Sequence, residues 1–280
     1  MNKRIFIVGN GESRKDFDLE SLRPHGKIYA CNAIYRDFTP DALISVDHGI
    51  MHEIYHSGYC YKNKCYFRDW NRLPGEMYDS LVFSGINDED REALRGYNII
   101  GSNERTDEKE FVMHGSNLKG IATIVRKDKT KYKKDVKQNQ LKISWVKDDD
   151  KVKNLRDIMP NRRDRGWAAG ATAGYVSILE DKPKEIFMVG NDLVSNTGKV
   201  NNVYKDTKNY VISENSATPH SNWVIQWKTL FREYKNITFY KVNPFADKGK
   251  DEVSKPIPEW SEYKNLKYID YSTLDKLIKK

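Results

Sequence analysis

Short apolar runs that end abruptly at a glycine, an asparagine or an aspartate recur along this chain. The first, Ile5 to Val8, has four apolar residues in succession, which is typical of a strand buried on both faces of a parallel sheet. Comparable strand candidates are residues 27–31, 41–46, 185–189 and 237–242, with weaker ones at 65–67, 81–83 and 97–100. Helical patterns between them cover residues 16–22, 167–179 and 223–234. This alternation predicts an α/β fold with a doubly wound, mostly parallel sheet.

A basic segment interrupts the pattern. Residues 126–165 contain 15 Lys and Arg against 7 Asp and no Glu, a local excess equal to the net charge of +8 for all 280 residues. The segment is also poor in apolar residues, so we expect it to be an inserted lid or arm. The predicted organisation is one Rossmann-like domain formed by residues 1–125 and 166–250, the basic insertion at 126–165, and a C-terminal tail at 251–280.

Two interpretations of the basic segment stay open. Clustered cations beside aromatic rings suit a polyanion, because neutralising phosphates releases counterions and bases stack on rings. In that interpretation the residues that contact nucleic acid are Lys131, Lys133, Lys134, Lys137, Arg162 and Arg163. In the second interpretation, the segment is a solvated surface loop, as charge runs commonly are.

Composition excludes several classes of protein. The chain has 17 Tyr, 10 Phe and 6 Trp, too much apolar mass for a chain that is disordered throughout. Its apolar runs fall short of the ~18 residues that a membrane-spanning helix requires. The run of four near the N-terminus is shorter than the ~7–15 residues of a secretory signal. We therefore expect a soluble, cytoplasmic protein without stable membrane insertion, in which the three cysteines are reduced.

A glycine turn directly follows the first predicted strand. Gly9, Asn10 and Gly11 precede Glu12 and Ser13, and such a turn lets a phosphate or ribose approach the backbone. The motif is neither a complete GxGxxG nor a Walker A loop. Polar side chains also end three later strands, and parallel strands present such ends at one sheet edge. The residues at these turns that are predicted to bind a nucleotide are Gly9, Asn10, Gly11, Ser13, Asn32, Asp47, Asn191 and Asp192.

His220 is the candidate general base. An imidazole has an ordinary pKa of about 6.5, which suits proton removal from a hydroxyl near neutral pH. It stands just before the helical pattern at 223–234, where Ser221 and Asn222 could cap the helix. In a purely structural role, the same residue would be a helix-entry histidine that bonds only to the backbone.

The order of these motifs resembles the bacterial sialyltransferases of glycosyltransferase family forty-two. The resemblance covers about residues 4–50 and 165–245 and excludes the basic segment. The motifs that carry it are Gly9 to Ser13, Cys31-Asn32, Ala169-Gly170, Lys184-Glu185-Ile186, Gly190 with Asp192, His220-Ser221-Asn222 and Asn243-Pro244.

The resemblance implies a Rossmann-like domain with a lid that binds a nucleotide-sugar without a metal. It implies that His220 is the base, that Tyr204 contacts the departing phosphate, and that Arg165 lies close to an arginine of the family. It further implies that Asn10, Asn32 and Gly170 hold the nucleotide. The chain departs from the family at Asp47 (commonly Asn), Val194 (a second tyrosine) and Ala169 (a serine), so CMP-sialic acid is not assumed as the donor.

These observations predict a metal-independent, inverting glycosyltransferase with no cofactor beyond the nucleotide-sugar co-substrate. The first acceptor hypothesis is DNA carrying a hydroxymethylated pyrimidine, flipped into the site; the close second is a cell-surface glycan. Two different functions would also fit the sequence: a pterin-type pyrophosphokinase, which would need Mg²⁺, and a non-catalytic nucleic-acid-binding module. A metal site on His48, His52 and His56 is a weaker hypothesis than a polar helix face. The oligomeric state is left open.

Overall fold

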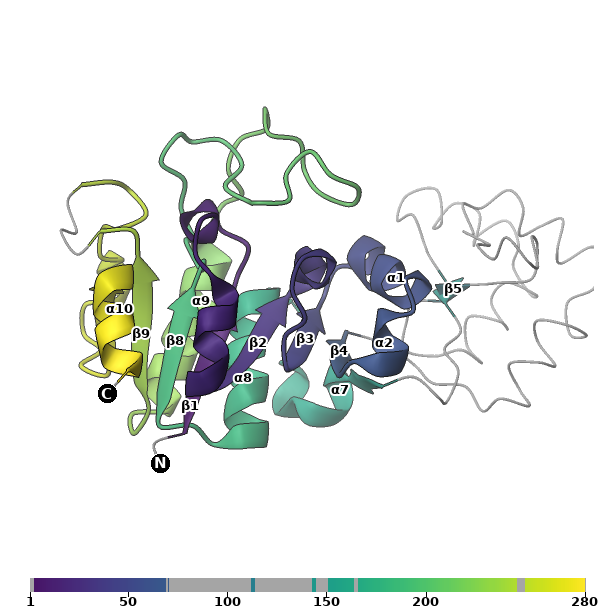
Figure 1. Ribbon diagram of the computed structural model, residues 1–280, viewed down its shortest axis with the longest axis horizontal. Helices are drawn as coiled ribbons and strands as arrows, with labels where there is room; N and C mark the ends of the chain where they lie inside the picture. Colours follow the sequence, from purple (N-terminus) through teal and green to yellow (C-terminus); the bar gives the residue numbers. More distant parts are fainter. Residues whose placement is uncertain are drawn as a thin grey trace, which may run out of the picture.

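An eight-stranded parallel sheet runs through the centre of the computed structural model (Figure 1). The structure describes residues 3–68, 70, 112–113, 143–144, 151–163, 166–245 and 250–279. In spatial order the strands are β10 (Leu266–Asp270), β9 (Thr238–Asn243), β8 (Glu185–Val189), β1 (Arg4–Val8), β2 (Lys27–Cys31), β3 (Ala42–Ser45), β4 (Cys65–Phe67) and β7 (Val152–Asn154). A separate antiparallel pair consists of β5 (Val112–Met113) and β6 (Ile143–Ser144).

Helices cover both faces of the sheet. On one face lie α7 (Leu155–Ile158), α8 (Ala169–Asp181), α9 (Ser221–Glu233) and the 3₁₀ turn η6 (Pro258–Trp260). On the other lie η2 (Leu19–His25), η3 (Asn32–Arg36), α1 (His48–His56), α2 (Tyr59–Lys62) and α10 (Tyr271–Ile278). Two further 3₁₀ turns are η1 (Glu12–Arg14) and η5 (Pro160–Arg162).

The apolar run of β1 explains its central place. Ile5 and Ile7 enter the core on the α8 face, while Phe6 and Val8 enter the core on the α10 face, and all four are fully buried. A strand that buries both of its faces reads as a continuous apolar run. The predicted α/β fold with a doubly wound parallel sheet is confirmed.

The sheet changes direction beside β1. The chain moves from β1 outward through β2, β3 and β4 to β7, then returns to the other side of β1 at β8 and continues to β10. In doubly wound sheets, ligands bind outside the carboxyl ends of the strands at such a reversal. The long loop from β8 to α9, residues 190–220, rises over this edge of the sheet (Figure 1).

The sheet corrects two predicted boundaries. The predicted tail at 251–280 contains β10, which pairs with β9, and α10, whose Leu274 is fully buried. The predicted insertion at 126–165 contains β7, which pairs with β4 through a buried Val152. Both are edge strands whose few buried residues stand among charged ones, so they lack a long apolar run.

The structure also tests the predictions for residues 16–22 and for the cysteines. Residues 16–22, predicted as helical, overlap the 3₁₀ turn η2 rather than an α-helix. The predicted strands at 81–83 and 97–100 lie outside the described residues. The three cysteines are free and buried, as expected. Within the described ranges, no helix is both long enough and apolar enough to cross a membrane.

Candidate functional site

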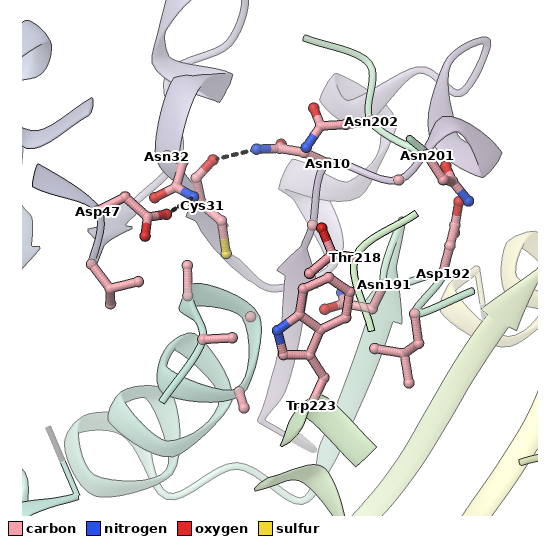
Figure 2. A pocket seen from close by; sticks show the side chains of 18 of the residues that line it. Asn10, Cys31, Asn32, Asp47, Asn191, Asp192, Asn201, Asn202, Thr218 and Trp223 are labelled. Atoms are coloured by element: carbon pink, nitrogen blue, oxygen red, sulfur yellow. Dashed lines mark hydrogen bonds between the residues drawn. The ribbon is translucent and has the colours of Figure 1, made fainter. Parts of the chain in front are cut away.

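A cavity of about 590 Å³ opens at the carboxyl edge of the sheet (Figure 2). Its wall is formed by the turns after β1, β2, β3 and β8, by the start of α8, by the β8–α9 loop and by the first two turns of α9. Of the predicted ligand-binding residues, those that line it are Gly9, Asn10, Gly11, Asn32, Asp47, Gly170, Asn191 and Asp192. Distant parts of the sequence therefore meet at one cavity.

The glycine turn is held against the turn that follows β8. Backbone N–H groups of Gly9 and Gly11 donate to the carbonyl oxygens of Val189 and Gly190, both at 2.8 Å. A Cβ atom on Gly9 would lie 2.5 Å from the Gly190 oxygen. A Cβ on Gly11 would collide with the Asp192 carboxylate. These glycines are thus required by packing between two turns, in addition to any approach by a ligand.

Ser13 supports the turn from outside the cavity. Its backbone N–H donates to Asp192 Oδ2 at 3.0 Å, and its hydroxyl donates to the second carboxylate oxygen. Ser13 is absent from the cavity wall, so its contribution is to hold Asp192, which is 4% exposed.

The Asn10 side chain joins three parts of the wall. Its amide Nδ2 donates to the Cys31 carbonyl at 3.0 Å and to the Tyr210 hydroxyl at 3.3 Å, while its oxygen accepts from Arg14 at 3.2 Å. Both amide hydrogens are therefore engaged within the protein. Asn10 lines the cavity as predicted, but its amide positions neighbours.

Tyr210 presents a hydroxyl hydrogen with no acceptor in the described chain. The hydroxyl oxygen accepts from Asn10 and from the backbone N–H of Ala33 at 3.2 Å, which uses both lone pairs. Burial raises the pKa of this phenol, so it stays protonated. Because Tyr210 lines the cavity, its remaining capacity is to donate to a bound ligand.

Tyr204, the tyrosine selected from sequence, lies behind the wall. It is 6% exposed, does not line the cavity, and accepts a hydrogen bond from Arg14 at 3.3 Å. Burial raises its pKa to about 12. The two tyrosine rings pack 5.7 Å apart, centroid to centroid, so Tyr204 supports Tyr210.

Arg14 places a buried positive charge beneath the glycine turn. The residue is only 7% exposed, and its Nε donates to the Gly9 carbonyl at 2.7 Å. Its remaining partners are Asn10 and Tyr204, and among the described residues it forms no ion pair with a carboxylate. Burying a charge without a counterion is costly, so an anion bound at the turn would be favoured.

The N-terminus of α8 faces the same cavity without a cap. Ala168 is the N-cap and offers no side-chain oxygen, and the first turn has no acidic residue. Gln226 of α9 fixes the approach to the helix, accepting from the Ala168 N–H at 2.8 Å and donating to the Gly166 carbonyl at 3.0 Å. Uncapped N–H groups and the helix dipole favour an anion such as a phosphate.

Asn191 fits against the start of this helix. Its amide donates to the carbonyls of Ile7 at 2.9 Å and Val189 at 3.1 Å, which fixes its orientation. Its oxygen then faces Gly170, where a Cβ atom would lie only 2.6 Å away. Asn191 and Gly170 thus pack together in the cavity wall, which accounts for a glycine at this helical position.

Asn32 and Asp47 lie at one end of the cavity, and Asp192 and Asn201 lie at the opposite end (Figure 2). Asn32 accepts from the Ser45 hydroxyl at 3.1 Å and donates to Asp47 Oδ2 at 3.4 Å. The first end of the wall therefore presents a carboxylate oriented by a neighbouring amide.

The wall is rich in carboxamides. Eight of them line the cavity, namely Asn10, Asn32, Asn191, Asn201, Asn202, Asn209, Asn222 and Gln226. A carboxamide both donates and accepts, which matches the hydroxyls of a sugar or the edge of a base. Most of these residues were not predicted as ligand-binding, although the seven asparagines within residues 191–222 are visible in the sequence.

Backbone strain also gathers at this wall. Asn32, Leu193 and Asn209 all have left-handed φ angles, of 56°, 66° and 65°, and all three line the cavity. This conformation is costly for a leucine in particular. Strained backbone clusters at functional sites, where surrounding structure maintains it.

His220 lies outside the wall. It is exposed and is the N-cap of α9, while Thr218 and Asn222 on either side of it line the cavity.

Arg163 is held by Glu233 through two contacts of 2.7 Å, so a nucleic acid would have to compete for its charge. Arg165, Lys131, Lys133, Lys134, Lys137 and the Arg162 side chain lie outside the described residues.

The cavity wall offers no reactive thiolate from its cysteine. Burial raises the pKa of Cys31 to about 12, so this thiol in the wall remains protonated. The described side chains contain no group of three or more His, Cys, Asp or Glu placed to hold a metal ion. The helix α1 forms over His48–His56 as the histidine spacing requires, but the side chains of those histidines lie outside the described part of the chain.

Comparisons with protein-family models, with curated proteins and with solved structures find no match to this chain.

Proposed function

We propose that this protein is a glycosyltransferase that moves a sugar from a nucleotide-sugar to an acceptor hydroxyl. The observation that carries the proposal is one cavity whose wall combines the glycine turn, the uncapped start of α8 and eight carboxamides. The first two features suit a phosphate, and the third suits hydroxyl groups and a base. The cavity volume of about 590 Å³ falls within the range for small-molecule sites.

The site must first stabilise the phosphate that leaves the sugar. When the bond between the anomeric carbon and the phosphate oxygen breaks, its electron pair stays with the phosphate. Donors already in position stabilise this charge without reorganisation. The available donors are the Tyr210 hydroxyl and the N–H groups at the start of α8, with the charge of Arg14 behind the turn.

The site must also activate the acceptor hydroxyl. Its oxygen attacks the anomeric carbon from the side opposite the phosphate, which inverts the configuration, and its proton passes to a base. His220 is our candidate, supported by the positions of Thr218 and Asn222 in the wall beside it. An acceptor would reach the exposed imidazole from solvent, while the donor occupies the cavity. We propose that no metal takes part.

The acceptor class is a separate proposal. A hydroxymethylated pyrimidine in DNA is our first candidate because of the local positive charge of residues 126–165. A cell-surface glycan is the second. We also propose that the protein is soluble and cytoplasmic.

A two-stage experiment tests this function. Thermal shift with a panel of UDP-, GDP-, ADP- and CMP-sugars, with Mg²⁺ and with EDTA, should identify donors that stabilise the fold. The best donor is then incubated with hydroxymethylated DNA and with glycans, and the products are weighed by mass spectrometry. A sugar-sized mass increase that persists in EDTA is the expected result.

His220→Ala separates catalysis from binding. General base catalysis contributes about 10²- to 10⁴-fold, so transfer should fall by that factor while donor binding persists. His25→Ala, on η2 away from the cavity wall, is the matched control and should leave transfer unchanged. Equal transfer by both variants would remove His220 from the mechanism. Strict Mg²⁺ dependence with pyrophosphoryl transfer would indicate a pyrophosphokinase instead. DNA binding without donor turnover would indicate a binding module.

A further inference from the structure

The Asp47 carboxylate does not cap the helix that it precedes. Asp47 is the N-cap residue of α1, a position where aspartate commonly accepts from backbone N–H groups of the first turn. Here its side chain makes no capping hydrogen bond. Its one hydrogen-bond partner within the described chain is Asn32, at a long 3.4 Å. The exposed carboxylate lines the cavity instead (Figure 2).

The neighbouring residues maintain this orientation. Asn32 adopts a left-handed backbone conformation directly after β2, and the Ser45 hydroxyl at the end of β3 donates to its oxygen at 3.1 Å. These contacts direct the Asn32 amide toward Asp47. The strained backbone and the unused cap are both accounted for if this carboxylate serves a ligand.

The chemistry of this carboxylate restricts the ligand group. An ionised carboxylate only accepts hydrogen bonds, and its two oxygens match two adjacent hydroxyls. A ligand carboxylate at the same place would meet like-charge repulsion. The charged residues that line the described wall are Asp47, Asp192 and Arg68, and the Arg68 guanidinium donates to the Trp167 carbonyl. The remaining polar groups are mostly neutral amides.

We propose that Asp47 binds a vicinal diol of the nucleotide-sugar, with its two carboxylate oxygens accepting hydrogen bonds from the adjacent hydroxyls. This inference rests on the proposed function and adds the substrate class: a donor recognised through uncharged adjacent hydroxyls. The diol belongs either to the ribose or to the transferred sugar, since both carry this chemistry. The carboxylate binds the ligand and takes no part in proton transfer.

Two ligand series test the proposal by calorimetric titration. The ribose series compares AMP, CMP, GMP and UMP with their 2′-deoxy counterparts. The sugar series compares UDP-glucose with UDP-3-deoxyglucose, in which neither the 2,3 nor the 3,4 pair of adjacent hydroxyls remains. The wild-type protein should lose about tenfold or more in affinity when the diol is broken, in one series or the other.

Asp47→Asn, which is nearly isosteric, is the decisive variant. It should reduce the diol preference to within about threefold while the shared phosphate contacts still retain nucleotide. Asp157→Asn, which removes an exposed carboxylate from α7 outside the cavity wall, is the charge-matched control and should keep the preference.

The outcomes separate the two proposals. If nucleotides bind but Asp47→Asn leaves every ratio unchanged, the role of Asp47 is wrong and the proposed function stands. Wild-type affinities that are unchanged both in the 2′-deoxy ribose series and with UDP-3-deoxyglucose also overturn the role of Asp47. If no nucleotide or nucleotide-sugar binds, the proposed function fails and this inference fails with it.

Discussion

The Asn10 carboxamide donates to the Tyr210 hydroxyl at 3.3 Å across a separation of 200 residues. This bond joins the glycine turn after β1 to the loop that rises between β8 and α9. It also determines what each residue can do. Asn10 is left with no free amide hydrogen, and Tyr210 is left with a hydrogen to donate into the cavity.

Tyr210→Phe should impair transfer more than donor binding. Removing one donor to a developing charge costs about 10²- to 10³-fold in rate. Steady-state kinetics with the donor identified by thermal shift should show a loss in kcat with a smaller change in KM.

Tyr204→Phe is the matched control for that variant. It removes a hydroxyl that accepts from the buried Arg14, so it should lower the free energy of unfolding by about 1–2 kcal/mol. Transfer at a temperature where the variant is folded should stay within a few-fold of wild type. The assignment of the phosphate contact to Tyr210 fails if Tyr204→Phe loses more activity than Tyr210→Phe.

Gly170→Ala should destabilise the protein although alanine favours helices. The gain in helix propensity is about 1 kcal/mol, but the new Cβ would lie 2.6 Å from the Asn191 oxygen, which two hydrogen bonds hold in place. We expect a net loss of about 1–3 kcal/mol by urea denaturation.

A double-mutant cycle attributes this loss to the pair. Asn191→Ala makes room for the methyl group, so Gly170→Ala should cost less in the Asn191→Ala background than alone. Additive losses would mean that the two residues do not compete for space.

Glu53 should contribute stability that is lost in acid. Burial opposes ionisation of this carboxylate, but hydrogen bonds from Tyr35, Arg36 and Asn209 outweigh burial and hold its pKa below the usual range. A lowered folded pKa gives stability that is present above the unfolded value of about 4.3 and disappears as pH falls through the folded value.

Glu53→Gln should remove this contribution and also weaken the attachment of the β8–α9 loop beside the cavity. Denaturant unfolding from pH 3 to 7 should show a deficit of about 1–3 kcal/mol at neutral pH that shrinks in acid. Because Asn209 and Thr207 are tied to Glu53 and Arg36, limited proteolysis should also cut the β8–α9 loop faster. A deficit that is constant with pH would contradict the ionic origin.

Lys241 should make stability rise with alkaline pH. It is fully buried, with Nζ donating to Asn243 Oδ1 at 2.6 Å, and burial lowers its pKa to about 8 despite opposing effects of Asp192 and Asp251. The unfolded chain, with a pKa near ~10.4, binds more protons between these values, so the free energy of unfolding increases across that window.

Lys241→Met provides the reference for this effect. The difference in unfolding free energy between wild type and Lys241→Met should grow by roughly 3 kcal/mol from about pH 8 to about pH 10.5. Comparing the two proteins at each pH cancels the titration of the many tyrosines. A difference that stays flat would show that Lys241 is solvated.

Much of the fold could be predicted from local patterns. The runs at Ile5 to Val8 and 185–189 are almost wholly apolar because those strands are covered on both faces, and the pattern is then visible in the chain itself. The strands β7 and β10 were not recognised because edge positions bury few residues, and Val152 stands alone among charged neighbours.

The candidate site was predicted only in part. Glycines and terminal asparagines are recognisable because strand ends of a parallel sheet converge by topology. Residue type does not predict whether a side chain lines the cavity, since Tyr204 and Tyr210 are both tyrosines on one loop. A hydrogen bond from Arg14 holds Tyr204 behind the wall, and a hydrogen bond from Asn10 orients Tyr210 in the wall.

The amino-acid pattern by itself determined the class of fold, the edge of the sheet at which a ligand would bind and the glycine turn at that edge, because these follow from periodicity and short-range sterics. Only the tertiary structure decided which groups have hydrogen-bonding capacity left for a ligand. That capacity is what remains after each donor and acceptor has met its partners, and those partners come from distant parts of the chain.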